Sequence, residues 1–224
     1  MVRTFRTALV LVTGMLLVNN TAAAAATRNI LVSRADLYRT CNTPGSPGTN
    51  YPNTEVEPNL AVNPANPQNL IGAWQQDRWS GGGARGLVAG YSLDGGRSWG
   101  QSAIPFTLCS PGGVPFGRAS DPWVSIGPDG IAYAIGLVSC LTCSGIVSST
   151  STDGGRTWTS PSFVLLDTNG FFSNDKPSIT ADPAHPGTAY AVWDRLDFRN
   201  NSCTAPTFMS KTTIGIPLSM HSVS

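Results

Sequence analysis

The stretch Ser92-Leu93-Asp94-Gly95-Gly96-Arg97-Ser98-Trp99 recurs as Ser151-Thr152-Asp153-Gly154-Gly155-Arg156-Thr157-Trp158, with aspartates at positions 94 and 153, 59 residues apart. A short strand-like run precedes each copy, so we expect a strand that reverses direction. The aspartate can accept hydrogen bonds from N–H groups of its own turn, and the glycines can adopt positive φ. The tryptophan can pack over the hairpin base. The repeat therefore predicts two equivalent β-turns.

A second repeat surrounds these turns. Residues 58–64, 122–128 and 177–183 each begin and end with proline and alternate apolar with small or polar residues. Such alternation predicts a short strand with a hard stop. A second apolar strand is predicted after each, at residues 69–74, 131–138 and 188–193. A period near 60 residues built from short strands is typical of propeller blades.

These repeats resemble the Asp-box, or BNR, repeat of sialidases and related secreted β-propellers, over about residues 54 to 213. The resemblance implies an all-β fold with four-stranded blades and six blades in a full ring. We expect a partial β-propeller of about three blades, at residues 54–115, 116–170 and 171–224. It also implies a structural role, away from the substrate face, for Ser92, Asp94, Gly96, Trp99, Ser151, Asp153, Gly155 and Trp158.

Composition favours a turn-rich β protein. Of 224 residues, 41% are hydrophobic and 12% are charged, against an ordinary charged share of about 25%. The chain has 24 Gly, 17 Pro and a formal net charge of +1. This balance excludes a coiled coil, a charged disordered tail and a basic nucleic-acid binder, so no nucleic-acid partner is expected.

The N-terminus predicts export. Arg3 and Arg6 precede an apolar or neutral run at residues 8–18, and alanines fill residues 22–26. That run is too short to span a bilayer but suits a secretory signal with an Ala-x-Ala exit. We expect a signal peptide at 1–26, an extension at 27–53 and a secreted or periplasmic location; an uncleaved anchor is the alternative. No later stretch is long and apolar enough to cross a membrane.

Export makes disulfides possible. The five cysteines are Cys41, Cys109, Cys140, Cys143 and Cys203, so at least one is free or pairs outside the chain. The Cys140–Cys143 pair also has the spacing of a redox motif or half a zinc site. Structural disulfides or inert thiols are favoured, and the pairing is not readable.

Carboxylates stand where the predicted inner strands begin. Glu57 and Asp121 directly precede the repeated proline, and Asp175 lies two residues before Pro177. In a propeller these would gather around the central channel, where they would repel the carboxylate of a sialic acid. They could bind a cation such as Ca²⁺, supply paired carboxylates for cleaving neutral sugars, or cap strand ends. No other cofactor is indicated.

Two Asp–Arg pairs also repeat, Asp77-Arg78 and Asp194-Arg195. They predict either a structural ion pair in each blade or a sugar-binding rim. In the second case a tryptophan could stack on the sugar unless it belongs to the core, the candidates being Trp74, Trp79, Trp123 and Trp193. The candidate catalytic residues are Asp77 and Asp121. The candidate substrate-binding residues are Arg78, Glu57, Asp175, Asp194 and Arg195.

The resemblance implies a glycosidase with three carboxylate-binding arginines, an Asp acid/base and a Tyr–Glu nucleophile. Its first arginine comes two residues before a proline, but the matching segment here is Glu55-Val56-Glu57-Pro58, and Arg78 falls near a second pocket arginine. A third Asp box is due near residue 214, yet residues 214–224 contain neither Asp nor Trp. This predicts a frameshift or premature stop near residue 213.

We therefore expect an exported sialidase-like glycoside hydrolase homologue that is inactive as this chain, with a carbohydrate or glycoconjugate as partner. The alternatives are a non-catalytic glycan- or protein-binding propeller and an inactive remnant of a longer gene. Open propeller edges would also favour self-association, and two copies could close a ring.

Overall fold

The computed structural model describes residues 29–43 and 47–212, and its fold is all-β. The expected all-β class is therefore confirmed. The predicted signal peptide and the predicted frameshift both lie outside the described residues. No helix in the described part of the chain is long and apolar enough to cross a membrane. The strands are β1 (Asn50–Val62), β2 (Leu70–Trp79), β3 (Ala84–Ser92), β4 (Gly100–Ile104), β5 (Arg118–Ile126), β6 (Ala132–Ser139), β7 (Ser144–Ser151), β8 (Ser162–Asp167), β9 (Phe172–Ala181), β10 (Ala189–Asp197) and β11 (Thr207–Thr212).

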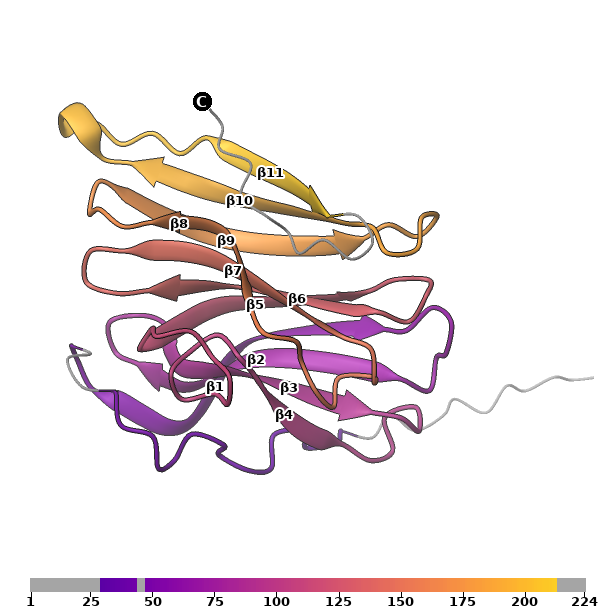
Figure 1. The fold of residues 1–224 in the computed structure, drawn as a ribbon. Helices are drawn as coiled ribbons and strands as arrows, with labels where there is room; N and C mark the ends of the chain where they lie inside the picture. The colour runs from indigo at the N-terminus through magenta and orange to yellow at the C-terminus, as the bar shows by residue number, and fades with distance from the viewer. Residues whose placement is uncertain (1–28, 44–46, 213–224) are drawn as a thin grey trace, which may run out of the picture. The chain divides into compact units, whose positions relative to one another are not determined.

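Consecutive strands pair antiparallel and form three successive meanders, β1–β4, β5–β8 and β9–β11 (Figure 1). A single pair between Ala84 and Ala119 also joins the first two meanders into one sheet. The proline-bounded segments form the C-terminal parts of β1, β5 and β9, and the predicted second strands fall at β2, β6 and β10. Strand β1 begins at Asn50, so it extends into the segment predicted as an N-terminal extension.

The core lies between neighbouring meanders. One apolar cluster joins the first meander to the second and includes Leu87, Phe106 and Val147, all buried. Another joins the second to the third and includes Ile135 and Ile179. Because side chains alternate between the two faces of a strand, the central strands of the second meander bury both faces. This explains why β6 is apolar along most of its length.

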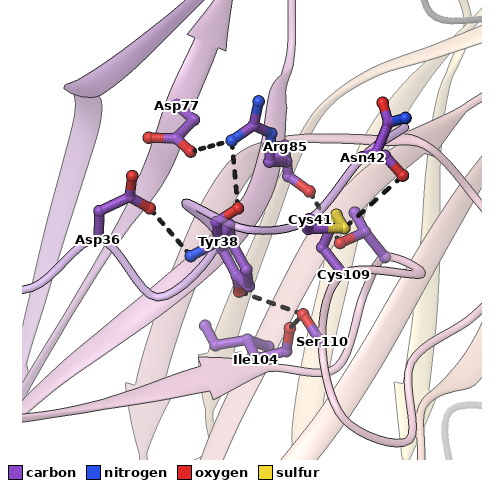
Figure 2. The surroundings of a disulfide bond; sticks show 10 residues. Asp36, Tyr38, Cys41, Asn42, Asp77, Arg85, Ile104, Cys109 and Ser110 are labelled. Carbon is purple, nitrogen blue, oxygen red and sulfur yellow. Dashed lines mark hydrogen bonds and ion pairs between the residues drawn. A yellow bond between two sulfur atoms is a disulfide. The ribbon is translucent and has the colours of Figure 1, made fainter. Parts of the chain in front are cut away.

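The segment before β1 is part of the compact unit that starts at Leu31. Figure 2 shows Tyr38 beside the Cys41–Cys109 disulfide. The Tyr38 hydroxyl is buried, donates to the Leu87 carbonyl oxygen at 2.6 Å and lies 3.1 Å from Ser110 Oγ. Burial raises the pKa of Tyr38. The segment is therefore fastened to the first meander both covalently and by hydrogen bonds.

A second disulfide closes the connection between β6 and β7 and joins Cys140 to Cys143. Cys203 is free and exposed. The sequence left this pairing open, because spacing alone does not say which cysteines approach one another.

The two repeated turns have matching hydrogen bonds. Asp94 Oδ1 accepts from the Ser98 N–H at 2.9 Å, and Asp94 Oδ2 accepts from the Ser98 hydroxyl at 2.6 Å. Asp153 accepts from the N–H and hydroxyl of Thr157 at 2.9 and 2.6 Å. The glycines of both turns have positive φ, between 72° and 92°. The same local sequence thus forms the same turn between β3 and β4 and between β7 and β8.

Candidate functional site

The first strand of each meander, β1, β5 and β9, carries the same backbone irregularity. Glu57, Asp121 and Lys176 have φ values of 55°, 52° and 50°, and each directly precedes a proline. At each position the pairing with the next strand shifts by one residue, which is a β-bulge. A non-glycine residue in this region costs roughly 1–3 kcal/mol, and such strain collects at functional sites. The bulges therefore mark this part of the strands as a candidate site.

Carboxylates link the bulges from one meander to the next. Glu57 Oε2 accepts from the Asp121 N–H at 3.3 Å, and Asp121 Oδ2 accepts from the Lys176 N–H at 3.1 Å. Asp175 Oδ1 accepts from the same N–H at 3.0 Å. Glu57, Asp121 and Asp175 thus lie together, although they are separated by 64 and 54 residues in the sequence.

A buried glutamine amide donates hydrogen bonds to this cluster of carboxylates. Gln75 in β2 is fully buried, and its Nε2 donates to Glu57 Oε2 and to Ser120 Oγ. The Ser120 hydroxyl donates in turn to Asp121 Oδ1 at 2.8 Å. This chain of hydrogen bonds fixes the positions of the Glu57 and Asp121 carboxyl groups relative to one another.

The carboxyl groups have pKa values displaced in opposite directions. Burial, together with the hydrogen bond and charge of Asp121, raises the pKa of Glu57. The pKa of Asp175 is raised by burial and by its own contact with Asp121. Burial also acts to raise the pKa of Asp121, but hydrogen bonds from Glu57, Ser120 and Asp175 lower it overall. Asp121 is therefore the preferred carboxylate, and its neighbours hold protons more readily.

Two cavities adjoin the carboxylates. The larger, which we call the loop cavity, has a volume of about 480 Å³ and is lined by the β2–β3 and β6–β7 connections. Glu57, Asp121, Arg78 and Arg118 line its wall. Burial and the neighbouring charge of Arg78 lower the pKa of Arg118. The cavity therefore has carboxylates and guanidinium groups in its wall.

The smaller cavity, which we call the inner-strand pocket, has a volume of about 240 Å³. It is formed by the three bulges and the residues that follow them. Its lining comprises Glu57, Pro58, Asn59, Asp121, Pro122, Trp123, Lys176, Pro177 and Ser178. Glu57 and Asp121 line both cavities and so stand between them.

Asp77 lies in a different environment from the other predicted site residues. It is fully buried, and its Oδ2 forms an ion pair with Arg85 at 2.9 Å (Figure 2). Its Oδ1 accepts from the Asn53 N–H at 2.9 Å. Asp77 lines neither cavity. The structure therefore does not bring this predicted catalytic residue together with Asp121.

One residue of each Asp–Arg dipeptide forms a structural ion pair, but its partner comes from another part of the chain. Asp77 pairs with Arg85, whereas Arg78 donates to the Gly83 carbonyl oxygen at 3.0 Å. Arg195 pairs with Asp167, and Asp194 accepts from the Thr207 hydroxyl at 2.7 Å. Adjacent strand residues point to opposite faces, so neighbours in the sequence cannot easily meet.

Asp194 and Arg195 line neither cavity. The Arg195 guanidinium instead lies 3.7 Å from the ring centre of Phe172. Of the predicted site residues, Glu57, Arg78 and Asp121 line the loop cavity, and Asp175 lies beside Asp121.

Sequence reasoning missed two residues of the site, Gln75 and Arg118. The two glutamines that follow the apolar start of β2, Gln75 and Gln76, were a usable signal, because a buried amide requires partners. Arg118 lies three residues before Asp121 and has no counterpart in the other repeats, so no pattern pointed to it.

A metal site receives no support. Among the residues described, no group of three or more His, Cys, Asp or Glu side chains could hold a metal ion. The carboxylates predicted as a Ca²⁺ site instead accept hydrogen bonds from each other's strands.

Comparison with known proteins gives the fold. No protein-family model and no curated protein matches the chain. Among solved structures, the α-L-arabinofuranosidase Arb93A from Fusarium graminearum, bound to an iminosugar inhibitor, has a TM-score of 0.52 at 19% identity, covering 71% of this chain and 45% of the enzyme. Its arabinobiose complex has a TM-score of 0.51 at 19% identity, with the same coverage. A Hadza microbial sialidase has a TM-score of 0.48 at 17% identity, covering 68% of this chain and 34% of that one.

The chain thus shares an all-β fold with the β-propeller glycosidase Arb93A at low sequence identity. It spans less than half the length of the arabinofuranosidase that it matches.

Proposed function

We propose that this chain forms about three blades of an exported, sialidase-like β-propeller that hydrolyses neutral glycosides. One observation carries the proposal: equivalent positions of β1 and β5 bring Glu57 and Asp121 together at a cavity, and Asp175 of β9 lies beside Asp121. The fold shared with an arabinofuranosidase and the two Asp-box turns support the same assignment. We assign those turns to stability and residues 1–26 to an export signal.

The roles follow from the opposed pKa displacements. Pairs of carboxyl groups whose surroundings separate their pKa values serve as acid and base in glycosidases. Glu57, with a raised pKa, is placed to donate a proton to the glycosidic oxygen. Asp121, with a lowered pKa, is placed to stabilise the developing positive charge on the sugar or to attack it.

The substrate class follows from charge and from fold. A carboxylate-bearing sugar beside Glu57 and Asp121 would be repelled by Asp121. Arb93A, whose fold this chain shares in part, is an arabinofuranosidase studied with arabinobiose, a neutral disaccharide. Neutral α-L-arabinofuranosides are therefore the first substrates to test.

A non-catalytic glycan-binding propeller is the second candidate. The hydrogen bonds that Glu57 and Asp121 accept from the Asp121 and Lys176 N–H groups favour it. Carboxylates whose only role is to stabilise the bulges would accept the same hydrogen bonds. In this second candidate the cavities bind a glycan, but no glycosidic bond is cleaved.

Chromogenic glycosides separate the two candidates. The wild-type protein is assayed on a panel of 4-nitrophenyl glycosides, with the α-L-arabinofuranoside first and a sialoside included. Asp121→Asn tests the site, and Asp94→Asn, the same change at a repeated turn, serves as its matched control. Cleavage that Asp121→Asn abolishes and Asp94→Asn retains supports the hydrolase. Binding of glycans without cleavage of any panel member would favour the second candidate.

A further inference from the structure

One of the four tryptophans considered for sugar stacking stands apart from the others. Trp74, Trp79 and Trp193 are 5%, 9% and 5% exposed, so they belong to the core. Trp123 is 42% exposed and lines the inner-strand pocket. It directly follows the Asp121–Pro122 bulge, and a bulge of this kind redirects the side chains beside it. The exposed indole therefore faces a cavity that contains both proposed catalytic carboxylates.

Polar groups in the pocket surround the indole and remain available. The Asn59 Oδ1 accepts from the Val124 N–H at 2.9 Å, which leaves its amide N–H groups free to donate. Within the described residues, the Trp123 indole N–H has no protein hydrogen-bond partner, and the Lys176 ammonium acts on Asp121 and Asp175 by its charge without forming an ion pair. An aromatic face with a few donors beside it is a common design of small-molecule pockets.

The charges of the pocket restrict what can bind there. Lys176 disfavours a cation, and Glu57 with Asp121 disfavours an anion. A neutral ring with an apolar C–H face and hydroxyl groups at its edge satisfies both the indole and the donors. The volume of about 240 Å³ lies just below the roughly 300–1,000 Å³ of ordinary ligand pockets, so it suits one small ring.

We propose that the inner-strand pocket is a sugar subsite in which Trp123 stacks on one ring of a glycan whose next ring occupies the loop cavity. Glu57 and Asp121 line both cavities, so the bond between the two rings lies against these carboxylates. The location of the cleaved bond rests on the proposed function, whereas the stacking does not.

Calorimetric titration with arabinobiose, lactose and cellobiose tests the subsite. The protein is titrated as wild type, as Trp123→Ala and as Leu60→Ala. Leu60 is the control because it is a 57% exposed apolar residue of β1 that lines neither cavity. We expect at least one disaccharide to bind, Trp123→Ala to raise its Kd about tenfold, and Leu60→Ala to leave it unchanged. Circular dichroism of both variants checks that they fold.

Two results would overturn the subsite: equal Kd values for wild type and Trp123→Ala, or no binding of any of the three sugars to wild type at millimolar concentration. Hydrolysis assays separate this proposal from the proposed function. Binding that depends on Trp123 in a protein that cleaves nothing leaves the subsite standing and rejects the hydrolase. Cleavage of a disaccharide with a KM that Trp123→Ala does not change keeps the hydrolase and rejects the subsite.

Discussion

The two ends of the strands differ in how strictly the sequence repeats. At one end, the β3–β4 and β7–β8 connections have nearly identical sequences and hydrogen bonds. At the other end, the β2–β3, β6–β7 and β10–β11 connections differ from one another. Residues 80–83 are rich in glycine, residues 140–143 contain a disulfide, and residues 198–206 include a short 3₁₀ turn. The same turn therefore recurs in the first and second meanders, whereas the varied connections supply residues to the loop cavity.

The carboxyl groups at the two ends of the strands also differ in the direction in which their pKa values are displaced. Hydrogen bonds from the hydroxyl and N–H of Ser98 lower the pKa of Asp94. Burial acts to raise the pKa of Asp153, but hydrogen bonds from Thr157 and Ser151 lower it overall. At the cavity end, burial and mutual contact raise the pKa of Glu57 and of Asp175. The turn end therefore stabilises negative charge on both aspartates, whereas the cavity end stabilises it on Asp121 and disfavours it on Glu57 and Asp175.

The largest expected effect is on catalysis at the cavity end. Asp121→Asn removes the preferred carboxylate and should lower kcat by roughly 100- to 10,000-fold on any glycoside that the wild type cleaves. Stability should change little, because the asparagine oxygen can still accept from the Lys176 N–H. Steady-state kinetics and urea unfolding measure the two quantities. An Asp121→Asn protein with wild-type kcat would show that the bulge carboxylate is only a structural cap.

Next in size is the contribution of the disulfide that fastens the N-terminal segment. Cys41 and Cys109 are 68 residues apart, so their bond constrains a long loop in the unfolded chain. Replacing both by serine should lower the free energy of unfolding by about 4 kcal/mol in the chain-entropy model.

The matched control is the other disulfide. Cys140 and Cys143 are three residues apart, so replacing both should have a distinctly smaller effect on unfolding by urea. Equal losses for the two double variants would contradict the comparison of loop lengths.

How much of the fold and of the candidate site could be predicted from the sequence depends on how far apart in the chain the contacting residues lie. Strands and turns follow from local patterns, which is why the repeats located β2, β6, β10 and the two aspartate turns. The clustering of Glu57 and Asp121 also followed, because equivalent positions of repeated strands come together.

The partner of Asp77 could not be read in the same way. Gln76 pairs with Gly86 and Arg78 with Ala84, so Arg85 lies opposite Asp77 only once the register of β2 and β3 is known. The buried position of Tyr38 likewise depends on a fold-back of the N-terminal segment onto Leu87, 49 residues away. Contacts of this kind need tertiary structure, which periodicity does not encode.

A smaller effect is expected at the turn end. Asp153→Ala leaves the N–H groups of Arg156 and Thr157 without their acceptor and should lower the free energy of unfolding by about 1–2 kcal/mol. Because the folded pKa of Asp153 is lowered, this stabilisation is present above the unfolded pKa of about 3.9 and disappears as the pH falls through the folded pKa. Urea unfolding at pH 7 and in acid should show the difference shrinking. Thr152→Ala, in the same turn, is the control, and an equal loss there would point to a general effect of the turn.

The smallest expected effect is a gain in stability when Glu57, at the cavity end, is replaced. The folded pKa of Glu57 is raised, so the group favours folding below its unfolded pKa and loses that contribution as the pH rises through the folded value. Glu57→Gln is neutral at every pH and should match the wild type in acid. At pH 7 it should be more stable by a few tenths of a kcal/mol, a small gain because solvent screens the exposed carboxylate. Thermal unfolding at both pH values measures this.

Since the same variant loses the proposed acid, a gain in stability with a loss of activity would show that this end keeps an unfavourable charge for its chemistry. A loss of stability at pH 7 would instead mean that the carboxylate serves the bulge, through the hydrogen bond that Glu57 Oε2 accepts from the Asp121 N–H.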